Sequence, residues 1–289
     1  MASIRDKYDS KKTVFSCEVF PPKKDQPIEP TMEKLKDFKD IDCDFLSVTY
    51  GAGGSNAGHA VEIASFIKKD VGVDVLSHIT SVGFSKSKLD EGLKVFRENG
   101  IENVLALRGD RPKTMTDEEY ESRDFFHASD MAEYISSSCP DFTIAGACYP
   151  DKHFEAKDYD EDIANLKKKT DSGCSFLISQ LFFDNSRFYK MKELMDRAGI
   201  KAPVSAGIMP VTSAKMLGTT VTLSGTSVPK SLSDIIAKYG ENDEDMKKAG
   251  IEYAIDQIKD LLSSGVPDGI HLYVMNRPFI ARTIFSEVR

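Results

Sequence analysis

Short apolar runs alternate with longer amphipathic segments along the whole chain. Most of these runs are almost continuously apolar rather than alternating, which is typical of parallel strands covered by helices. Eight strands are therefore predicted, at Thr13–Phe20, Phe45–Tyr50, Asp74–Thr80, Asn103–Gly109, Thr143–Pro150, Phe176–Phe183, Val204–Pro210 and Gly269–Arg277.

The segments between the runs carry apolar residues on one face, as Met32, Leu35 and Phe38 do, and are predicted as helices. Several end in a glycine just before the next strand, which is typical of helix C-termini. Eight such units, with no flexible linker between them, predict a single (β/α)₈ TIM barrel over residues 1–289. The interval between the last two strands is longer than the others, which predicts an extra loop and helix there.

Composition narrows the classes of partner. The 289 residues include 40% hydrophobic ones and carry a formal charge of −8, which argues against nucleic acid or an anionic membrane as partner. The first residues form no apolar signal, and no run reaches the ~18 apolar residues of a membrane span, so a cytoplasmic location is expected. The five cysteines form no CxxC pair, which favours reduced core thiols over a metal or redox site.

Candidate chemistry gathers where the strands end, because residues at the carboxyl ends of the strands line the active site of such barrels. Glu18 lies in the apolar stretch SCEVFPPK, so burial is expected to raise its pKa and allow general-acid catalysis. A glutamate held by a structural partner is the alternative. Arg108, Gly109 and Asp110 end the fourth strand, where Asp110 offers a second carboxylate and a structural Arg–Asp pair is the alternative.

Three other groups of polar residues follow strands. Thr49, Tyr50 and His78 end the second and third, next to a glycine cluster at 51–54 that could cradle phosphate but matches neither GxGxxG nor a P-loop. A sector after the fifth strand carries lysines that could hold a pyrophosphate, although a solvated helix face has the same pattern. Its members are Tyr149, His153, Asp162, Asn165, Lys168 and Lys169.

Gln180 and Arg277 end the sixth and eighth strands. A buried glutamine in an apolar run must form hydrogen bonds, either with other groups of the protein or with a heterocyclic ligand. Arg277 either meets a carboxylated substrate or forms a salt bridge that closes the barrel between its first and last strands.

The ordered motifs CEVFPPK, FLSVTYGAGGS, SHIT, VLALRGD, CYPDKHFEA, ISQLFFD, GIMPV and LYVMNR resemble methylenetetrahydrofolate reductases from Thr13 to Arg277. The resemblance is to the short bacterial type, a catalytic barrel without a further domain. It implies a cytoplasmic homo-oligomer that holds FAD, takes electrons from NADH or NADPH in a ping-pong reaction, and reduces 5,10-methylenetetrahydrofolate to 5-methyltetrahydrofolate. The product would feed methyl groups to methionine synthesis or other one-carbon metabolism.

The resemblance also assigns roles. Glu18 would be the general acid that helps open the folate ring, and Asp110 would stabilise the resulting cation and hydrogen-bond the pterin. Gln180 and Arg277 would hold the folate, and Thr49 and Gln180 would face the nicotinamide. The residues expected to bind the flavin are Tyr50, Ala52, His78, Arg108, Gly109, Asp110, Ala128, Tyr149, His153, Ala156, Asp162, Asn165, Lys168 and Lys169.

Two departures from the family pattern are visible. Well-studied bacterial members carry a glutamine and an aromatic residue after the seventh strand, whereas segment 211–229 has Met216 in the glutamine position and no aromatic nearby. Lys168 stands where arginine is common, which keeps the charge but loses bidentate geometry.

Two alternative functions remain at this stage. In one, an iron–sulfur partner protein supplies the electrons to the flavin, because the chain has no Cys₄ cluster pattern of its own. In the other, the barrel is a non-redox aldolase or pterin methyltransferase, which would need a lysine within a strand run or a corrinoid partner. No apolar strand run contains such a lysine.

Overall fold

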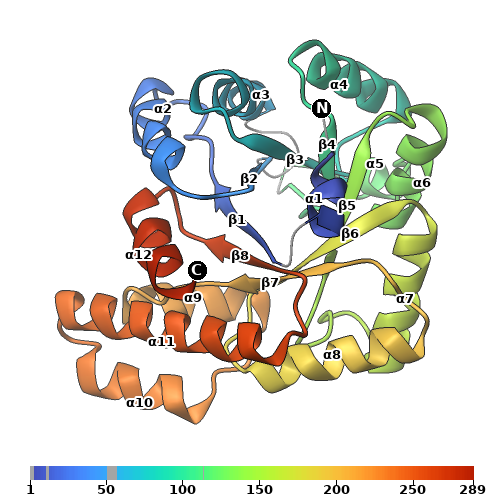
Figure 1. Cartoon of the computed structure of the whole chain (residues 1–289). Helices are drawn as coiled ribbons and strands as arrows, with labels where there is room; N and C mark the ends of the chain where they lie inside the picture. The colour runs from blue at the N-terminus through green and yellow to red at the C-terminus, as the bar shows by residue number, and fades with distance from the viewer. Residues whose placement is uncertain (1–2, 11–12, 51–56, 113) are drawn as a thin grey trace.

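The computed structural model describes residues 3–10, 13–50, 57–112 and 114–289. Eight parallel strands close into a barrel in chain order, which confirms the predicted TIM barrel (Figure 1). The strands are β1 (Val14–Val19), β2 (Phe45–Val48), β3 (Asp74–Thr80), β4 (Asn103–Leu107), β5 (Thr143–Cys148), β6 (Cys174–Ser179), β7 (Val204–Ile208) and β8 (Gly269–Tyr273).

Helices surround the strands, as their amphipathic patterns predict. They are α2 (Glu29–Leu35), α3 (Ala57–Phe66), α4 (Lys86–Glu98), α5 (Asp117–Glu121), α6 (Ala128–Ser138), α7 (Tyr159–Asp171), α8 (Asn185–Arg197), α9 (Ala214–Ser224), α10 (Lys230–Tyr239), α11 (Asp243–Ser264) and α12 (Pro278–Val288). A short 3₁₀ helix, η1 (Lys36–Asp40), extends α2, and a π-helical turn, η3 (Ile67–Val71), extends α3.

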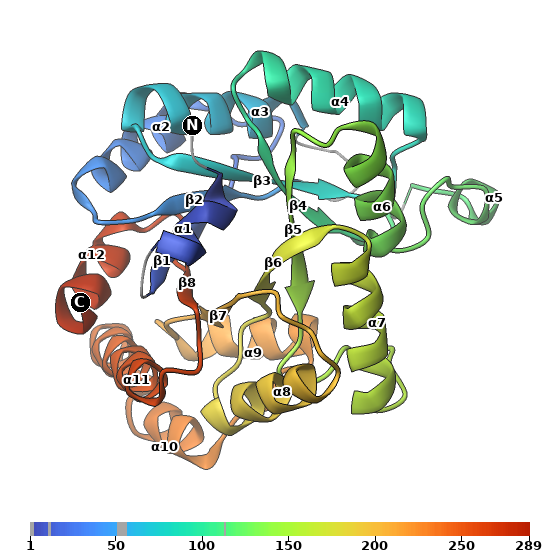
Figure 2. The same cartoon turned by 45° about the vertical axis from the view of Figure 1, so that its right-hand side comes forward.

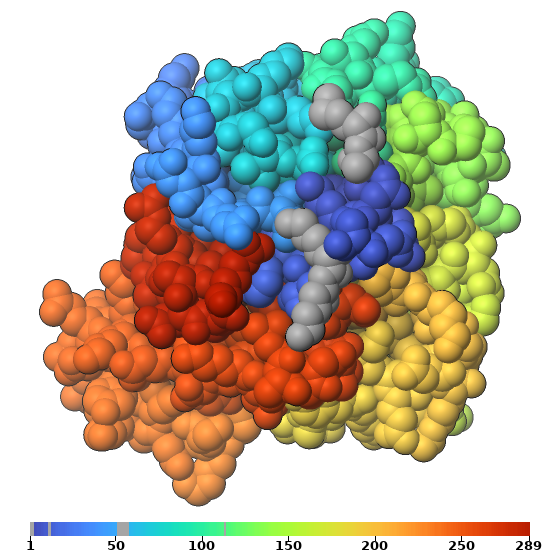
Figure 3. All heavy atoms as spheres, viewed as in Figure 1, coloured from blue at the N-terminus to red at the C-terminus, as the bar shows by residue number. Residues whose placement is uncertain are grey.

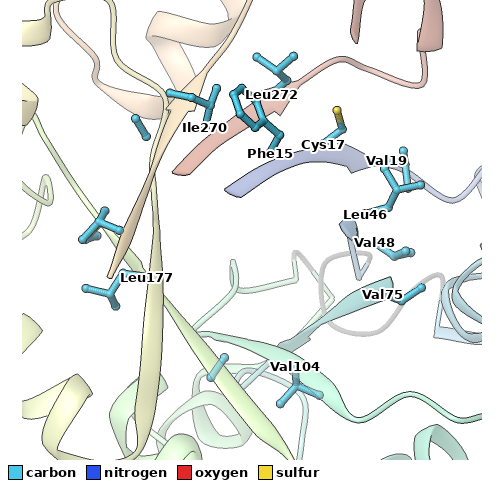
Figure 4. Close-up of a cluster of buried hydrophobic side chains, with 14 of the residues drawn as sticks. Phe15, Cys17, Val19, Leu46, Val48, Val75, Val104, Leu177, Ile270 and Leu272 are labelled. Carbon is cyan, nitrogen blue, oxygen red and sulfur yellow. The ribbon is translucent and has the colours of Figure 1, made fainter. Parts of the chain in front are cut away.

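Alternate residues of each strand face the barrel interior or the helices. In β1, Phe15, Cys17 and Val19 pack in the large core between strands and helices, part of which Figure 4 shows. Val14 instead packs in a smaller core inside the barrel. Because side chains alternate along a strand, Ser16 and Glu18 share the inward face with Val14.

The amino end of the barrel is closed by α1 (Ile4–Ser10). Ile4 is fully buried among interior residues such as Phe45 and Phe176, and the Tyr8 hydroxyl lies 2.8 Å from Ser205 Oγ. Figures 1 and 2 show α1 lying across this end, and Figure 3 shows it filling the middle of the same face. Access to the interior residues of β1 is therefore from the carboxyl ends of the strands.

The predicted insertion between the last two strands is confirmed, but it contains two helices, α9 and α10, ahead of α11, where one extra helix was predicted. Leu217 of α9, Leu232 of α10 and Met246 of α11 form a separate core with Leu181 and Met209, which follow β6 and β7. The insertion thus packs directly on the carboxyl end of the barrel.

Most observed strands stop before the predicted runs do. Tyr50, Gly109, Pro150, Phe183 and Arg277 all lie in the loops that follow the strands. In contrast, β6 begins earlier than predicted, at Cys174 rather than Phe176. Cys174 pairs with Ile144 ahead of an irregularity in the register. In the part of the chain that the structure describes, no helix is long and apolar enough to cross a membrane.

Candidate functional site

Glu18 lies at the carboxyl end of β1 with only 9% of its surface exposed. Its Oε2 is 3.6 Å from Nε2 of His78 on β3. Burial raises the pKa of Glu18 to about 8 and lowers that of His78 to about 3. At neutral pH the two side chains are therefore a carboxylic acid and a neutral imidazole rather than an ion pair.

A second buried histidine lies below this pair. His271 Nδ1 lies 2.7 Å from Ser16 Oγ, and its Nε2 lies 3.4 Å from Ser47 Oγ. Burial and the nearby His78 lower the pKa of His271 to about 3. Beside it, the Tyr273 hydroxyl donates to Ser179 O at 2.8 Å. The floor beneath Glu18 is thus polar but uncharged.

Sequence reasoning missed His271 and Tyr273, although a signal was available. Both lie on alternate positions of β8, the same face as each other, and Tyr273 pairs in register with Glu18. A strand register could have placed them beside the predicted acid, but the apolar pattern alone does not supply that register.

The loop after β4 carries Arg108, Gly109 and Asp110. Arg108 forms a bidentate pair with Glu155, at 2.5 and 2.9 Å, rather than the Arg–Asp pair considered as an alternative. Gly109 has φ +76°, and a Cβ there would lie 2.7 Å from Thr80 Cβ. Only glycine fits this approach to β3. Asp110, the next residue, is exposed at the mouth of the barrel.

A cavity of about 340 Å³ lies between the ends of β4 and β5 and helices α6 and α7. Its lining brings together many of the residues that the resemblance assigned to the flavin, which are Arg108, Ala128, Tyr149, His153, Ala156, Asp162, Asn165, Lys168 and Lys169. The sector after the fifth strand therefore faces a cavity rather than solvent alone.

Lys169 is the most buried cation of this cavity. Its ammonium donates to Ala147 O, and burial lowers its pKa. The side chain passes over Gly146, where a Cβ would come within 2.7 Å of Lys169 Cδ. Lys168 is more exposed and lies 3.5 Å from Asp130. Both lysines end α7, whose first turn is capped by Asp158.

The lining fits a ligand with anionic and aromatic parts. Arg108, Lys168 and Lys169 supply cations for phosphate groups. Tyr149 and His153 supply ring faces, with their centroids 4.7 Å apart in an edge-on arrangement. A dinucleotide such as FAD has these two kinds of group.

Other residues assigned to the flavin do not line this cavity. Tyr50 packs against Phe84, with ring centroids 5.7 Å apart, and His78 lies inside the barrel against Glu18. Thr49, which precedes Tyr50, donates its backbone N–H to Val19 O. Ala52 and the glycine cluster at 51–54 lie outside the described residues.

Gln180 and Arg277 have different local partners. Gln180 Oε1 accepts from the N–H of Leu181 at 2.9 Å, so the side chain is held at the end of β6. Arg277 NH1 donates to Thr212 Oγ1 at 2.9 Å. Among the described residues Arg277 forms no ion pair, so the predicted alternative of a salt bridge that closes the barrel is wrong. Asn276, the residue before it, instead makes two hydrogen bonds with the backbone of Phe20.

The five cysteines are free thiols, and three of them, Cys17, Cys148 and Cys174, are buried. Within the described ranges, no group of three or more His, Cys, Asp or Glu side chains is arranged to hold a metal ion.

The sequence matches the family described as "Methylenetetrahydrofolate reductase" over residues 3–289. It is 34% identical to "Methylenetetrahydrofolate reductase (NADH) 1" of Arabidopsis thaliana, across 94% of this chain and 48% of that protein. It is 31% identical to "5,10-methylenetetrahydrofolate reductase" of Pectobacterium carotovorum, across 93% of this chain and 88% of that protein. A probable NADPH-dependent relative in Caenorhabditis elegans is 31% identical, with 43% of its length covered.

The chain thus spans less than half the length of its plant and nematode relatives but most of the bacterial one. Among solved structures, a protein of Clostridium thermocellum, described as binding two copies of 5-methyl-5,6,7,8-tetrahydrofolic acid, is similar with a TM-score of 0.67. It shares 14% sequence identity, and the match covers 98% of this chain and 99% of that one. At that identity the likeness shows the fold.

Proposed function

The chain belongs to the methylenetetrahydrofolate reductase family, and on that premise we propose that it reduces 5,10-methylenetetrahydrofolate to 5-methyltetrahydrofolate with FAD as cofactor and NADH or NADPH as electron donor. The observation that carries the proposal is the buried acid Glu18 at the only end of the described barrel that α1 does not cover. A cavity whose lining includes Arg108, Lys168 and Lys169 together with three carboxylates opens at the ends of neighbouring strands.

When bound, FAD supplies the redox step by passing two electrons from the nicotinamide to the folate. The chain's contribution is to bind and orient it. Arg108, Lys168 and Lys169, which line the cavity, would neutralise the diphosphate. Lys169 contributes most, because a buried ammonium interacts with an anion at lower dielectric than an exposed one does.

Glu18 holds the proton that the substrate needs. Opening the five-membered ring of 5,10-methylenetetrahydrofolate breaks a carbon–nitrogen bond, and the leaving N10 takes up a proton. With a pKa of about 8, Glu18 keeps that proton at neutral pH and can transfer it from its carboxyl group. His78 lies 3.6 Å from Glu18 but stays neutral, so it does not take the proton from the acid.

Ring opening leaves a cation on the substrate, and Asp110 is the carboxylate proposed to stabilise it and to hydrogen-bond the pterin. Gln180 and Arg277 are proposed to hold the folate, and Thr49 and Gln180 to face the nicotinamide. A ping-pong order, in which the oxidised nucleotide leaves before the folate binds, is part of the same proposal. The product would supply methyl groups to methionine synthesis or other one-carbon metabolism, and a homo-oligomeric, cytoplasmic enzyme is part of the same proposal.

Segment 211–229 favours one alternative, in which a partner protein supplies the electrons. Well-studied bacterial members of the family carry an aromatic residue here, whereas in this chain the Thr220 hydroxyl hydrogen-bonds the Met209 thioether at 3.7 Å. Met216, in the position of the family's glutamine, accepts from Thr212. Segment 211–229 itself carries no aromatic ring on which a nicotinamide could stack.

FAD titration and product assays test the proposal. The purified chain should bind FAD and form 5-methyltetrahydrofolate with NADH or NADPH. Lys169→Met should raise the Kd for FAD at least about tenfold, because it removes a buried charge-assisted contact. Lys167→Met is the matched control, since Lys167 pairs with Asp171 on the same helix and does not line the cavity.

Each outcome separates the hypotheses. Failure to bind FAD, or equal effects of the two lysine variants, contradicts the assigned cofactor site. Bound FAD without oxidation of either nucleotide favours the electron-donating partner instead.

A further inference from the structure

The backbone before Arg277 is held in an uncommon conformation. Met275 and Asn276 have φ values of 52° and 55°, in the left-handed region that residues other than glycine seldom adopt. Asn276 is tied to the backbone of Phe20 by hydrogen bonds of 2.7 and 2.8 Å. The main chain therefore presents Arg277 at a fixed place on the rim.

The side chain of Arg277 is held by one hydroxyl group. Its NH1 donates to Thr212 Oγ1 at 2.9 Å, and Thr212 is 7% exposed. The same hydroxyl donates to Met216 Sδ at 3.4 Å. A threonine hydroxyl has one proton, and a thioether can only accept, so this arrangement leaves an oxygen lone pair for the guanidinium.

Thr212 and Met216, the two residues that hold the Arg277 side chain, are themselves fixed in place. Ser213 caps α9 by accepting from Met216 N at 3.2 Å, which places Met216 in the first turn. Val211, before Thr212, is 1% exposed and lies against α11, where a Cβ on Gly250 would be 1.8 Å from Val211 O. Thr212 thus stands on a rigid support rather than on a free loop.

Arg277 keeps most of its donors for a ligand. A guanidinium has five N–H donors, and Thr212 takes one of them. Among the described residues, no carboxylate lies within ion-pair distance of Arg277, whose side chain is exposed at the rim. The arrangement suits a carboxylate that arrives with the substrate.

We propose that Thr212 is a positioning residue, with its hydroxyl fixed by Met216, and that it orients Arg277 toward the carboxylates of the glutamyl end of the folate. This inference rests on the proposed function. It assigns a task to the segment in which this chain departs from its family, since a glutamine at position 216 could donate as well as accept and would not fix the hydroxyl in this way.

Steady-state kinetics with two substrates test this role. The substrates are 5,10-methylenetetrahydrofolate and its pteroate analogue, which lacks the glutamate. Thr212→Val should raise KM for the folate roughly tenfold, about the effect of losing a hydrogen bond to a charged group, with a much smaller change in kcat. The analogue should show little change, Thr212→Ser should restore KM, and Met216→Leu should raise it about two- to threefold.

A mutant cycle supplies the decisive comparison. In an Arg277→Ala background, Thr212→Val should have almost no further effect, because both variants remove the same contact. Thr222→Val is the matched control, since Thr222 is exposed on α9 and its hydroxyl donates to Gly218 O of the same helix. Independent effects in the double variant, or an equal rise in KM for the analogue, would overturn the inference. Absence of folate reduction in the unmodified chain would instead reject the proposed function.

Discussion

The ionisation of Glu18 is controlled by burial rather than by a charged partner. The nearest basic group, His78, is itself kept neutral by burial. Removal of water disfavours the charged form of each, so the acid keeps its proton and the base does not take one. This reciprocal effect lets two titratable groups lie 3.6 Å apart without forming a salt bridge.

The pH dependence of folate reduction follows from this. Protonated Glu18 is the active form, so kcat/KM for methylenetetrahydrofolate should fall as pH rises through about 8. Stopped-flow measurements between pH 6 and 10 would show the decline. A rate that is flat or rising across this range contradicts the role of Glu18 as the acid.

Substitution of Glu18 should separate the two halves of the reaction. Glu18→Gln removes the transferable proton at nearly constant size, so folate reduction should slow by about a hundredfold or more. Oxidation of the nucleotide needs no such proton and should change little. Glu91→Gln, an exposed substitution on α4, is the control. Equal slowing of both half-reactions would remove Glu18 from its assigned role.

The same raised pKa predicts a pH-dependent stability. Folding shifts the pKa of Glu18 from its usual 4.5 to about 8. The stability contributed by the neutral acid is complete below pH 4.5, declines as the unfolded state ionises, and is lost by pH 8. Urea denaturation should therefore show that Glu18→Gln gains stability relative to the parent as pH rises from 4.5 to 8, with no further gain above that. A difference independent of pH would contradict the buried acid.

At the scale of elements, the insertion between β7 and β8 is held against the barrel by a close backbone contact. Gly250 of α11 faces the carbonyl of Val211, where a Cβ would have only 1.8 Å of space. α11 and the segment carrying Thr212 therefore meet without an intervening side chain. Helical periodicity predicted a helix here, but it could not show which glycine marks the contact.

Two helical glycines should respond in opposite directions. Gly250→Ala forces the backbone apart and should lower the free energy of unfolding by about 1–3 kcal/mol. Gly218→Ala on α9 has no atom within 4 Å of the new Cβ, and its better helix propensity should stabilise by about 0.5–1 kcal/mol. Chemical denaturation of both variants checks the pair. Tolerance of Gly250→Ala would mean that α11 is not seated on Val211 in this way.

Over the whole molecule, the order of apolar runs was enough to predict the barrel and the insertion. Periodicity records which residues are buried, and eight regular units admit few other architectures. The rim residues could be named for the same reason, because the apolar runs show roughly where each strand gives way to a loop, although the strands themselves end earlier. Partners could not be named: Arg108 pairs with Glu155, and Asn276 rather than Arg277 joins the first and last strands. Such contacts depend on loop paths that leave no periodic signal.

The most direct test of the central claim is an anaerobic two-step spectroscopic experiment on the purified chain loaded with FAD. Addition of NADH or NADPH should abolish the flavin absorbance near ~450 nm, and methylenetetrahydrofolate added next should restore it and yield 5-methyltetrahydrofolate. This result would establish both halves of the proposed reaction and identify the donor. A chain that binds no FAD, or whose absorbance does not return with the folate after chemical reduction, would contradict the account.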